Sequence, residues 1–203
     1  MERQSCLRLG AFLPRSRANG PGVRAALWVQ GCLRRCPGCC NPEFQDPEEG
    51  ESVTVADVLT WVQNAMPVDG VTLTGGEPLD QAAALAVLCG EVRSRGLTVV
   101  CFTGYTLAEA EAAGREEYRV LLRRVDLLVA GPYLREQRSS APLLASANQK
   151  LHFLSGRIVP ADLEGLPRAE VIMEGGELRV SGFDPQLSER LRHALEGGRS
   201  DNA

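Results

Sequence analysis

The chain has 203 residues, 44% of them hydrophobic and 24% charged, which is typical of one globular domain large enough to bury a core. Its 26 acidic and 22 basic side chains leave a net charge of −4, which gives no electrostatic reason to expect nucleic acid as a partner. No apolar run approaches the roughly 20 residues that span a bilayer, and none at the N-terminus suggests a signal peptide, so we expect no membrane association.

Seven cysteines are the unusual feature of the composition. Their number is odd and no export signal precedes them, which argues against a disulfide framework. Thiols stay reduced in the cytosol, where clustered cysteines are more often metal ligands. The sequence therefore predicts a cytoplasmic protein with a metal site.

The first predicted element is a buried strand over residues 24–30, whose apolar run leads directly into Gly31-Cys32. A loop rich in Pro, Glu and Asp follows over residues 42–51. Thr54 then precedes apolar residues at helical spacing and is expected to cap a helix that buries Val55, Val58, Leu59 and Val62.

Strands and helices alternate from residue 70 onwards. We expect strands over 70–74, 97–102 and 125–130, and helices over 79–95, 107–113 and 116–124, the first ended by Gly96 and the second capped by Thr106. This alternation is typical of an α/β fold with a parallel sheet. The units are too few for a closed eight-stranded barrel, so we predict an open partial (β/α) barrel of about six units.

The pattern changes after residue 156. Residues 169–174 and 177–181 flank Gly175-Gly176 and predict a β-hairpin. Residues 185–195 predict a terminal helix. We therefore expect residues 1–156 to form the partial barrel and residues 157–203 to be a hairpin-and-helix appendage of the same domain.

The cysteine-rich stretch at residues 31–40 carries the main chemical signal. Cys32, Cys36 and Cys39 have the spacing C-x3-C-x2-C on a loop that contains Pro and Gly. Three thiolates on one loop can hold three irons of a cubane cluster and leave the fourth iron open. A zinc site would need a fourth ligand, for which only the adjacent Cys40 is at hand, and buried unligated thiols are a further alternative. The spacing favours the cluster over both.

A second motif, Thr74-Gly75-Gly76-Glu77-Pro78, follows a predicted strand and precedes a predicted helix. Alone it could be a simple turn with Pro at the start of a helix. Together with the cysteine motif it resembles the radical S-adenosylmethionine superfamily. That resemblance implies a [4Fe–4S] cluster on the three cysteines and S-adenosylmethionine as cofactor. It also implies that Gly75, Gly76 and Glu77 hold the amino group of the cofactor's methionine part while Pro78 fixes the loop.

A narrower resemblance covers roughly residues 10–155. Residues 19–24 and 30–41 are similar to the glycyl-radical-enzyme activases, and residues 103–106, 125–129 and 148–150 are most similar to the anaerobic ribonucleotide reductase activating proteins. The chain departs from that pattern in carrying Cys40 for Tyr, Ala130 for Asp, and Leu-Ala-Ser-Ala at 144–147 for Arg-Gly-Ser-Ser. These departures bear on the identity of the activated partner.

The resemblance implies that an electron from a flavodoxin or ferredoxin cleaves S-adenosylmethionine into methionine and a 5′-deoxyadenosyl radical. The expected function is activation of a glycyl radical enzyme, and the alternatives are direct hydrogen abstraction from a small molecule or peptide and a non-catalytic binding module. Four further residues at strand ends are expected to contact the cofactor, although Tyr105 could equally be a packing residue at a helix start: Asn41, Thr103, Gly104 and Tyr105.

Overall fold

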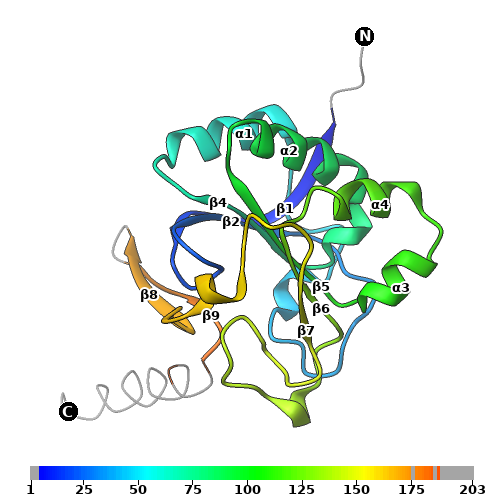
Figure 1. The fold of residues 1–203 in the computed structure, drawn as a ribbon, viewed down its shortest axis with the longest axis vertical. Coiled ribbons are helices and arrows are strands. Elements are labelled where there is room, and N and C mark those ends of the chain that lie inside the picture. Colours follow the sequence, from blue (N-terminus) through cyan, green and yellow to red (C-terminus); the bar gives the residue numbers. More distant parts are fainter. Residues whose placement is uncertain (1–4, 175–176, 185–186, 188–203) are drawn as a thin grey trace.

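The computed structural model describes residues 5–174, 177–184 and 187 of the chain. Within them the main element is a seven-stranded sheet in the order β3-β1-β2-β4-β5-β6-β7 (Figure 1). The strands are β1 (Cys6–Ser16), β2 (Arg24–Val29), β3 (Glu51–Thr54), β4 (Gly70–Gly75), β5 (Thr98–Thr103), β6 (Leu127–Ala130) and β7 (Lys150–Phe153). The fold is therefore mixed α/β, as the alternation of elements predicts.

The centre of this sheet is parallel and its edges are antiparallel. Strands β2, β4, β5 and β6 pair in parallel, whereas β1, β3 and β7 pair antiparallel with their neighbours. The expected number of about six parallel units is therefore too high, because the described residues contain four parallel strands. The connections from β1 to β2 and from β6 to β7 contain no α-helix, and without a helical crossover the chain returns antiparallel.

In the described part of the chain, four α-helices lie between the strands: α1 (Val55–Asn64), α2 (Ala82–Ser94), α3 (Leu107–Ala112) and α4 (Glu116–Leu122). Thr54 and Thr106 form capping boxes with Asp57 and Glu109, which confirms both predicted N-caps. Helix α2 begins three residues later than expected, because Pro78–Gln81 forms a short 3₁₀ helix first.

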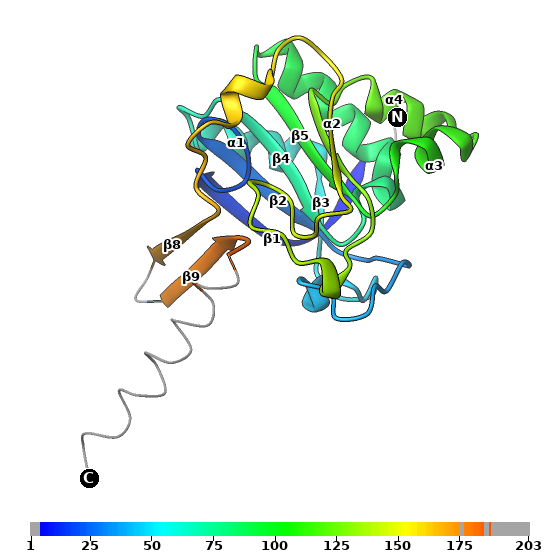
Figure 2. The ribbon, with the colours of Figure 1, turned by 60° about the horizontal axis from the view of Figure 1, so that its bottom comes forward.

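Helices α1, α2 and α4 gather on one side of the sheet and bury its first face (Figures 1 and 2). Alternate strand residues supply the sheet side of this core, among them Leu27, Leu73, Val99 and Leu128. Within residues 5–174, 177–184 and 187, no layer of α-helices covers the opposite face, which carries loops, polar groups and a smaller apolar cluster around Val100, Leu127 and Ile158.

The buried side chain of Arg24 links neighbouring strands on the second face of the sheet. Its fully buried guanidinium donates through Nε to Thr72 Oγ1 at 2.8 Å and through Nη2 to the carbonyls of Val71 and Thr98 at 2.7 and 2.9 Å. Nη1 donates to Pro21 O and Thr98 Oγ1. A buried charge is tolerated only when its donors are satisfied, so this network fixes β2, β4 and β5 side by side.

The predicted hairpin is confirmed as β8 (Ala169–Glu174) paired antiparallel with β9 (Glu177–Gly182). It forms a separate two-stranded sheet beside the loop that joins β1 and β2 (Figures 1 and 2). The helix expected over residues 185–195 lies outside the described residues. Among the described helices, none has both the length and the apolar character needed to cross a bilayer.

Candidate cluster and cofactor site

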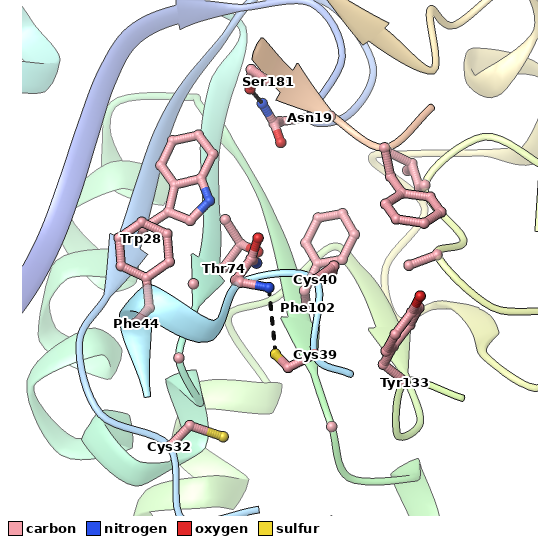
Figure 3. Close-up of a pocket in the computed structure, with 18 of the residues that line it drawn as sticks. Asn19, Trp28, Cys32, Cys39, Cys40, Phe44, Thr74, Phe102, Tyr133 and Ser181 are labelled. Atoms are coloured by element: carbon pink, nitrogen blue, oxygen red, sulfur yellow. Dashed lines mark hydrogen bonds between the residues drawn. The ribbon is translucent and has the colours of Figure 1, made fainter. Parts of the chain in front are cut away.

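A cavity of about 730 Å³ opens on the second face of the sheet. Trp28, Thr74 and Phe102 project into it from β2, β4 and β5 (Figure 3). Their chain neighbours Leu27, Leu73 and Cys101 point the other way into the helix-covered core, because side chains alternate along a strand. The cavity therefore lies over the carboxyl-terminal half of the parallel strands, where open α/β sheets place their ligand sites.

The cysteine loop forms one end of this cavity. Cys32, Cys36 and Cys39 are each half-buried and all three line it (Figure 3 labels Cys32 and Cys39). The loop can turn tightly because Gly31 and Gly38 take positive φ angles of 96° and 66°. Its base is pinned by backbone hydrogen bonds from Gly31 and Cys32 to the segment 44–45.

The thiols of this loop differ in acidity. The pKa of Cys39 is lowered to about 6, first because the Cys40 side chain hydrogen bonds to its sulfur and then because the Asn41 N–H, 3.4 Å from Sγ, does the same. Burial raises the pKa of Cys32. The thiolate is the form that binds metal, so the lowered pKa of Cys39 favours the form that a metal site would need.

The arrangement of the thiols fits a cluster better than a single ion. Across residues 5–174, 177–184 and 187, no three His, Cys, Asp or Glu side chains converge on one metal position. A tetrahedral zinc site needs such convergence, whereas the cysteines of a cubane bind different irons and surround a larger body. Three cysteines that open into one cavity meet the second requirement.

The Gly-Gly-Glu-Pro turn lies directly against the cysteine loop. Gly76 N donates to Val29 O at 2.7 Å, and Glu77 N donates to Gly31 O at 2.9 Å. The turn is therefore bonded to the end of β2 and to the residue that precedes Cys32. The two motifs that the sequence separates by 35 or more positions share one wall of the cavity.

Glu77 is 1% exposed, and its carboxylate faces the end of β5. Oε1 accepts from Leu79 N at 2.9 Å and from Thr103 Oγ1 at 2.8 Å, and Oε2 accepts from Gly104 N at 2.8 Å. Burial raises the pKa of Glu77 to about 7 even though these hydrogen bonds oppose the shift. The carboxylate thus braces β4 against β5 with donors that belong to the protein itself.

Gly76 has no room for a side chain. A Cβ there would lie 2.2 Å from Gly31 O and 2.8 Å from Phe44 O, both of them backbone atoms. We expect Gly76→Ala to lower the free energy of unfolding by about 2 kcal/mol, as overpacking does, and to reduce the iron bound after reconstitution. Thermal unfolding and iron analysis check this. Gly156→Ala is the control, since a Cβ at Gly156 meets nothing within 4 Å; equal stability of the two variants would contradict the prediction.

Of the other residues expected at the site, the cavity lining includes Asn41, Gly75, Thr103 and Gly104. The lining does not include Pro78 or Tyr105. Pro78 is buried at the start of the 3₁₀ helix, and the Tyr105 ring packs between the Arg34 guanidinium, 4.5 Å from its centroid, and Tyr118, 6.1 Å away. Tyr105 therefore lies where a packing residue at the start of a helix would lie, which is the alternative interpretation that the sequence left open.

Sequence reasoning missed the rest of the cavity wall. Thr74 stands in the second motif but was given no role there, whereas Trp28 and Phe102 could have been found as positions that alternate with core residues near the ends of their strands. Asn19, Tyr133 and Ser181 come from segments far apart in the chain and line the same cavity only in the folded protein, with Asn19 beside Ser181 (Figure 3).

Comparison with known proteins places this site in a family context. The family model described as a 4Fe-4S single cluster domain matches residues 18–152. An anaerobic ribonucleoside-triphosphate reductase-activating protein from Vibrio cholerae is 32% identical over 155 residues, which cover 70% of this chain and 94% of that protein. A pyruvate formate-lyase-activating enzyme from Staphylococcus aureus is 32% identical over 117 residues, or 55% of this chain and 47% of that protein. The crystal structure of QueE from Escherichia coli aligns with a TM-score of 0.43 and 14% identity over 50% of this chain and 53% of that one.

Proposed function

Because the chain belongs to the 4Fe-4S single cluster domain family, and within it to the radical S-adenosylmethionine activases, we propose that it activates a glycyl radical enzyme such as an anaerobic ribonucleotide reductase. The observation that carries this proposal is that Cys32, Cys36, Cys39 and the Gly75–Glu77 turn line one cavity at the ends of parallel strands.

The proposed roles follow from the contacts described. Cys32, Cys36 and Cys39 hold the [4Fe–4S] cluster, with Cys39 already favoured as a thiolate. A [4Fe–4S] cluster held by these three cysteines would supply the electron for reductive cleavage of S-adenosylmethionine, and with it the radical chemistry that removes a hydrogen atom from the partner's glycine. Gly75 and Gly76 let the backbone approach the cofactor's amino acid part, and Glu77 holds that backbone in place.

Aromatic side chains form part of the cavity wall. Trp28 and Phe102 line it, and the Phe44 ring lies 6.5 Å from that of Trp28. These side chains keep water from the reacting atoms, which a radical intermediate requires. Asn41, Thr103 and Gly104 complete the cofactor side of the cavity as candidate contacts.

Three finer points belong to the same proposal. The sheet serves as an open, partial (β/α) barrel, supported by the helices on one face and the cavity on the other. Residues 157–203 belong to the same domain, supported by hydrogen bonds between the hairpin and the β1–β2 loop. The electron donor is a flavodoxin or ferredoxin. The compartment is the cytoplasm, supported by seven cysteines of which none forms a disulfide bond.

A second candidate is a stand-alone radical enzyme that takes hydrogen directly from a small molecule or peptide. It is favoured by the hairpin, because Ile172, Ser181 and Gly182 add a wall to the cavity. The two candidates differ in the molecule that gives up the hydrogen atom: a glycine of a partner enzyme in the first, and a small molecule or peptide in the second.

The distinguishing experiment mixes the reconstituted, reduced protein with S-adenosylmethionine and the anaerobic ribonucleoside-triphosphate reductase of the same genome. Electron paramagnetic resonance is expected to show a glycyl radical on the reductase, which is absent when S-adenosylmethionine is left out. Cleavage of S-adenosylmethionine without any radical on the reductase would instead support the stand-alone enzyme.

A further inference from the structure

The β8–β9 hairpin lies beyond residue 152, where the match to the family model ends. Its register gives it two distinct faces. Glu170 pairs with Ser181 and Ile172 with Arg179 on one face, while Val171 pairs with Val180 and Met173 with Leu178 on the other. The two faces have different surroundings.

The inner face is fastened to the β1–β2 loop. Asn19 Nδ2 donates to Ser181 Oγ at 2.5 Å and to Ser16 Oγ at 2.7 Å. The Glu170 carboxylate accepts from the Ser16 hydroxyl and, at 3.1 Å, from the Arg17 N–H. Asn19, Ser16 and Ser181 are buried, so the two bonds from Asn19 are shielded from water and help to hold the hairpin in a fixed orientation.

A second attachment lies across the cavity. The Phe183 ring, just after β9, packs edge-on against Tyr133 at 6.2 Å between centroids, and both residues line the cavity. The hairpin is therefore held at two sides of the cavity, with Ser181 at the opposite end from Cys32 (Figure 3).

The outer face is apolar and open to solvent. Val171 and Val180 are 43% and 45% exposed, and Met173 and Leu178 are 75% and 55% exposed. The register sets them as two adjacent cross-strand pairs, which makes one continuous patch. A contiguous apolar patch on an ordered element marks an interaction site more often than scattered exposed residues do.

The position and size of the patch indicate what covers it. Val180 belongs both to the patch and to the cavity lining, so the patch continues into the cavity mouth. Four side chains are too few for a stable dimer of this chain, which would need about 1,600 Å² of buried surface. They suit an additional contact made by a protein that also places a segment inside the cavity.

We propose that the outer face of the hairpin, formed by Val171, Met173, Leu178 and Val180, is a docking surface for the glycine-bearing partner enzyme. This inference rests on the proposed function. The partner places its glycine segment in the cavity and an apolar surface beside that segment on the hairpin. The patch thus selects the partner without taking part in cleavage of S-adenosylmethionine.

The test is the double variant Met173→Ser/Leu178→Ser in the full-length, cluster-loaded protein. Neither side chain lines the cavity, so cleavage of S-adenosylmethionine with dithionite and no partner should stay at the wild-type rate. Affinity for the anaerobic ribonucleoside-triphosphate reductase of the same genome, measured by calorimetry, should fall by about tenfold or more. Met66→Ser/Val87→Ser is the matched control, since these exposed apolar residues lie away from the hairpin, and it should bind normally.

The following results would overturn the docking surface or the proposed function on which it rests. Unchanged affinity in the hairpin variant would overturn the docking surface, as would an equal loss in the control. A shift in the oligomeric state that accounts for the loss would assign the patch to a second copy and overturn the proposal too. If the wild type never cleaves S-adenosylmethionine, the proposed function itself fails, which is distinct from a hairpin variant that cleaves and binds like the wild type.

Discussion

Replacing Cys36 with alanine is expected to abolish the cluster and all cleavage of S-adenosylmethionine. Cys36 lies between two other thiols that open into the same cavity, and each thiolate of such a set holds a different iron. Loss of one ligand leaves an iron without its protein anchor, so the cubane is not retained. After anaerobic reconstitution the wild type should carry about four irons per chain, and the variant should fall far below that.

Cys40→Ala is the matched control, because it removes a neighbouring thiol of the same loop. Its effect should be milder, since Cys40 lies outside the proposed ligand set and its thiol only lowers the pKa of Cys39. The variant should bind a full cluster, and its iron content should fall off at a higher pH than that of the wild type because Cys39 becomes less acidic. Loss of the cluster in Cys40→Ala, with retention in Cys36→Ala, would reassign the ligands.

Glu77→Ala is expected to lower the free energy of unfolding by about 4 kcal/mol, because one buried and one part-buried N–H group lose their acceptor and each unsatisfied group costs about 1–3 kcal/mol. The orphaned donors are those of Leu79 and Gly104, and the Thr103 hydroxyl loses its acceptor as well. For a chain of this length the melting temperature should drop by about 10 °C. Denaturant unfolding of the cluster-free protein measures the effect without interference from iron.

Glu77→Gln provides the graded control. Its amide oxygen can still accept from Leu79 N and Thr103 Oγ1, but its NH₂ group cannot accept from Gly104 N. Its stability should therefore fall between those of the wild type and the alanine variant. A stable Glu77→Ala protein would show that the carboxylate does not brace β4 against β5.

Elements that depend mainly on their own residues could be predicted from the sequence. The strands β2, β4, β5 and β6 and the caps at Thr54 and Thr106 follow from apolar runs and local hydrogen bonding. Strand β1 was missed because register shifts at residues 9–11 and 13–16 break its alternation. It also contains Pro14, which argues against a strand in sequence terms. The parallel count was overestimated because pairing direction depends on connections, not on strand composition.

The same distinction between local and long-range features applies to the candidate site. The cysteines and the Gly-Gly-Glu-Pro turn could be predicted because each motif is continuous in sequence. The direction of the Glu77 carboxylate could not be predicted, because its partners Thr103 and Gly104 belong to another strand. The contact of Asn19 with Ser181 joins residues 162 positions apart, which no local pattern encodes.

The central claim is that this chain cleaves S-adenosylmethionine by radical chemistry. The most direct measurement is an anaerobic assay in which the iron- and sulfide-reconstituted protein receives dithionite and S-adenosylmethionine, and 5′-deoxyadenosine is quantified. We predict 5′-deoxyadenosine and methionine in equal amounts from the wild type, and neither from Cys36→Ala. A wild-type protein that carries a full cubane cluster and yields no 5′-deoxyadenosine, with or without the partner enzyme, would contradict the claim.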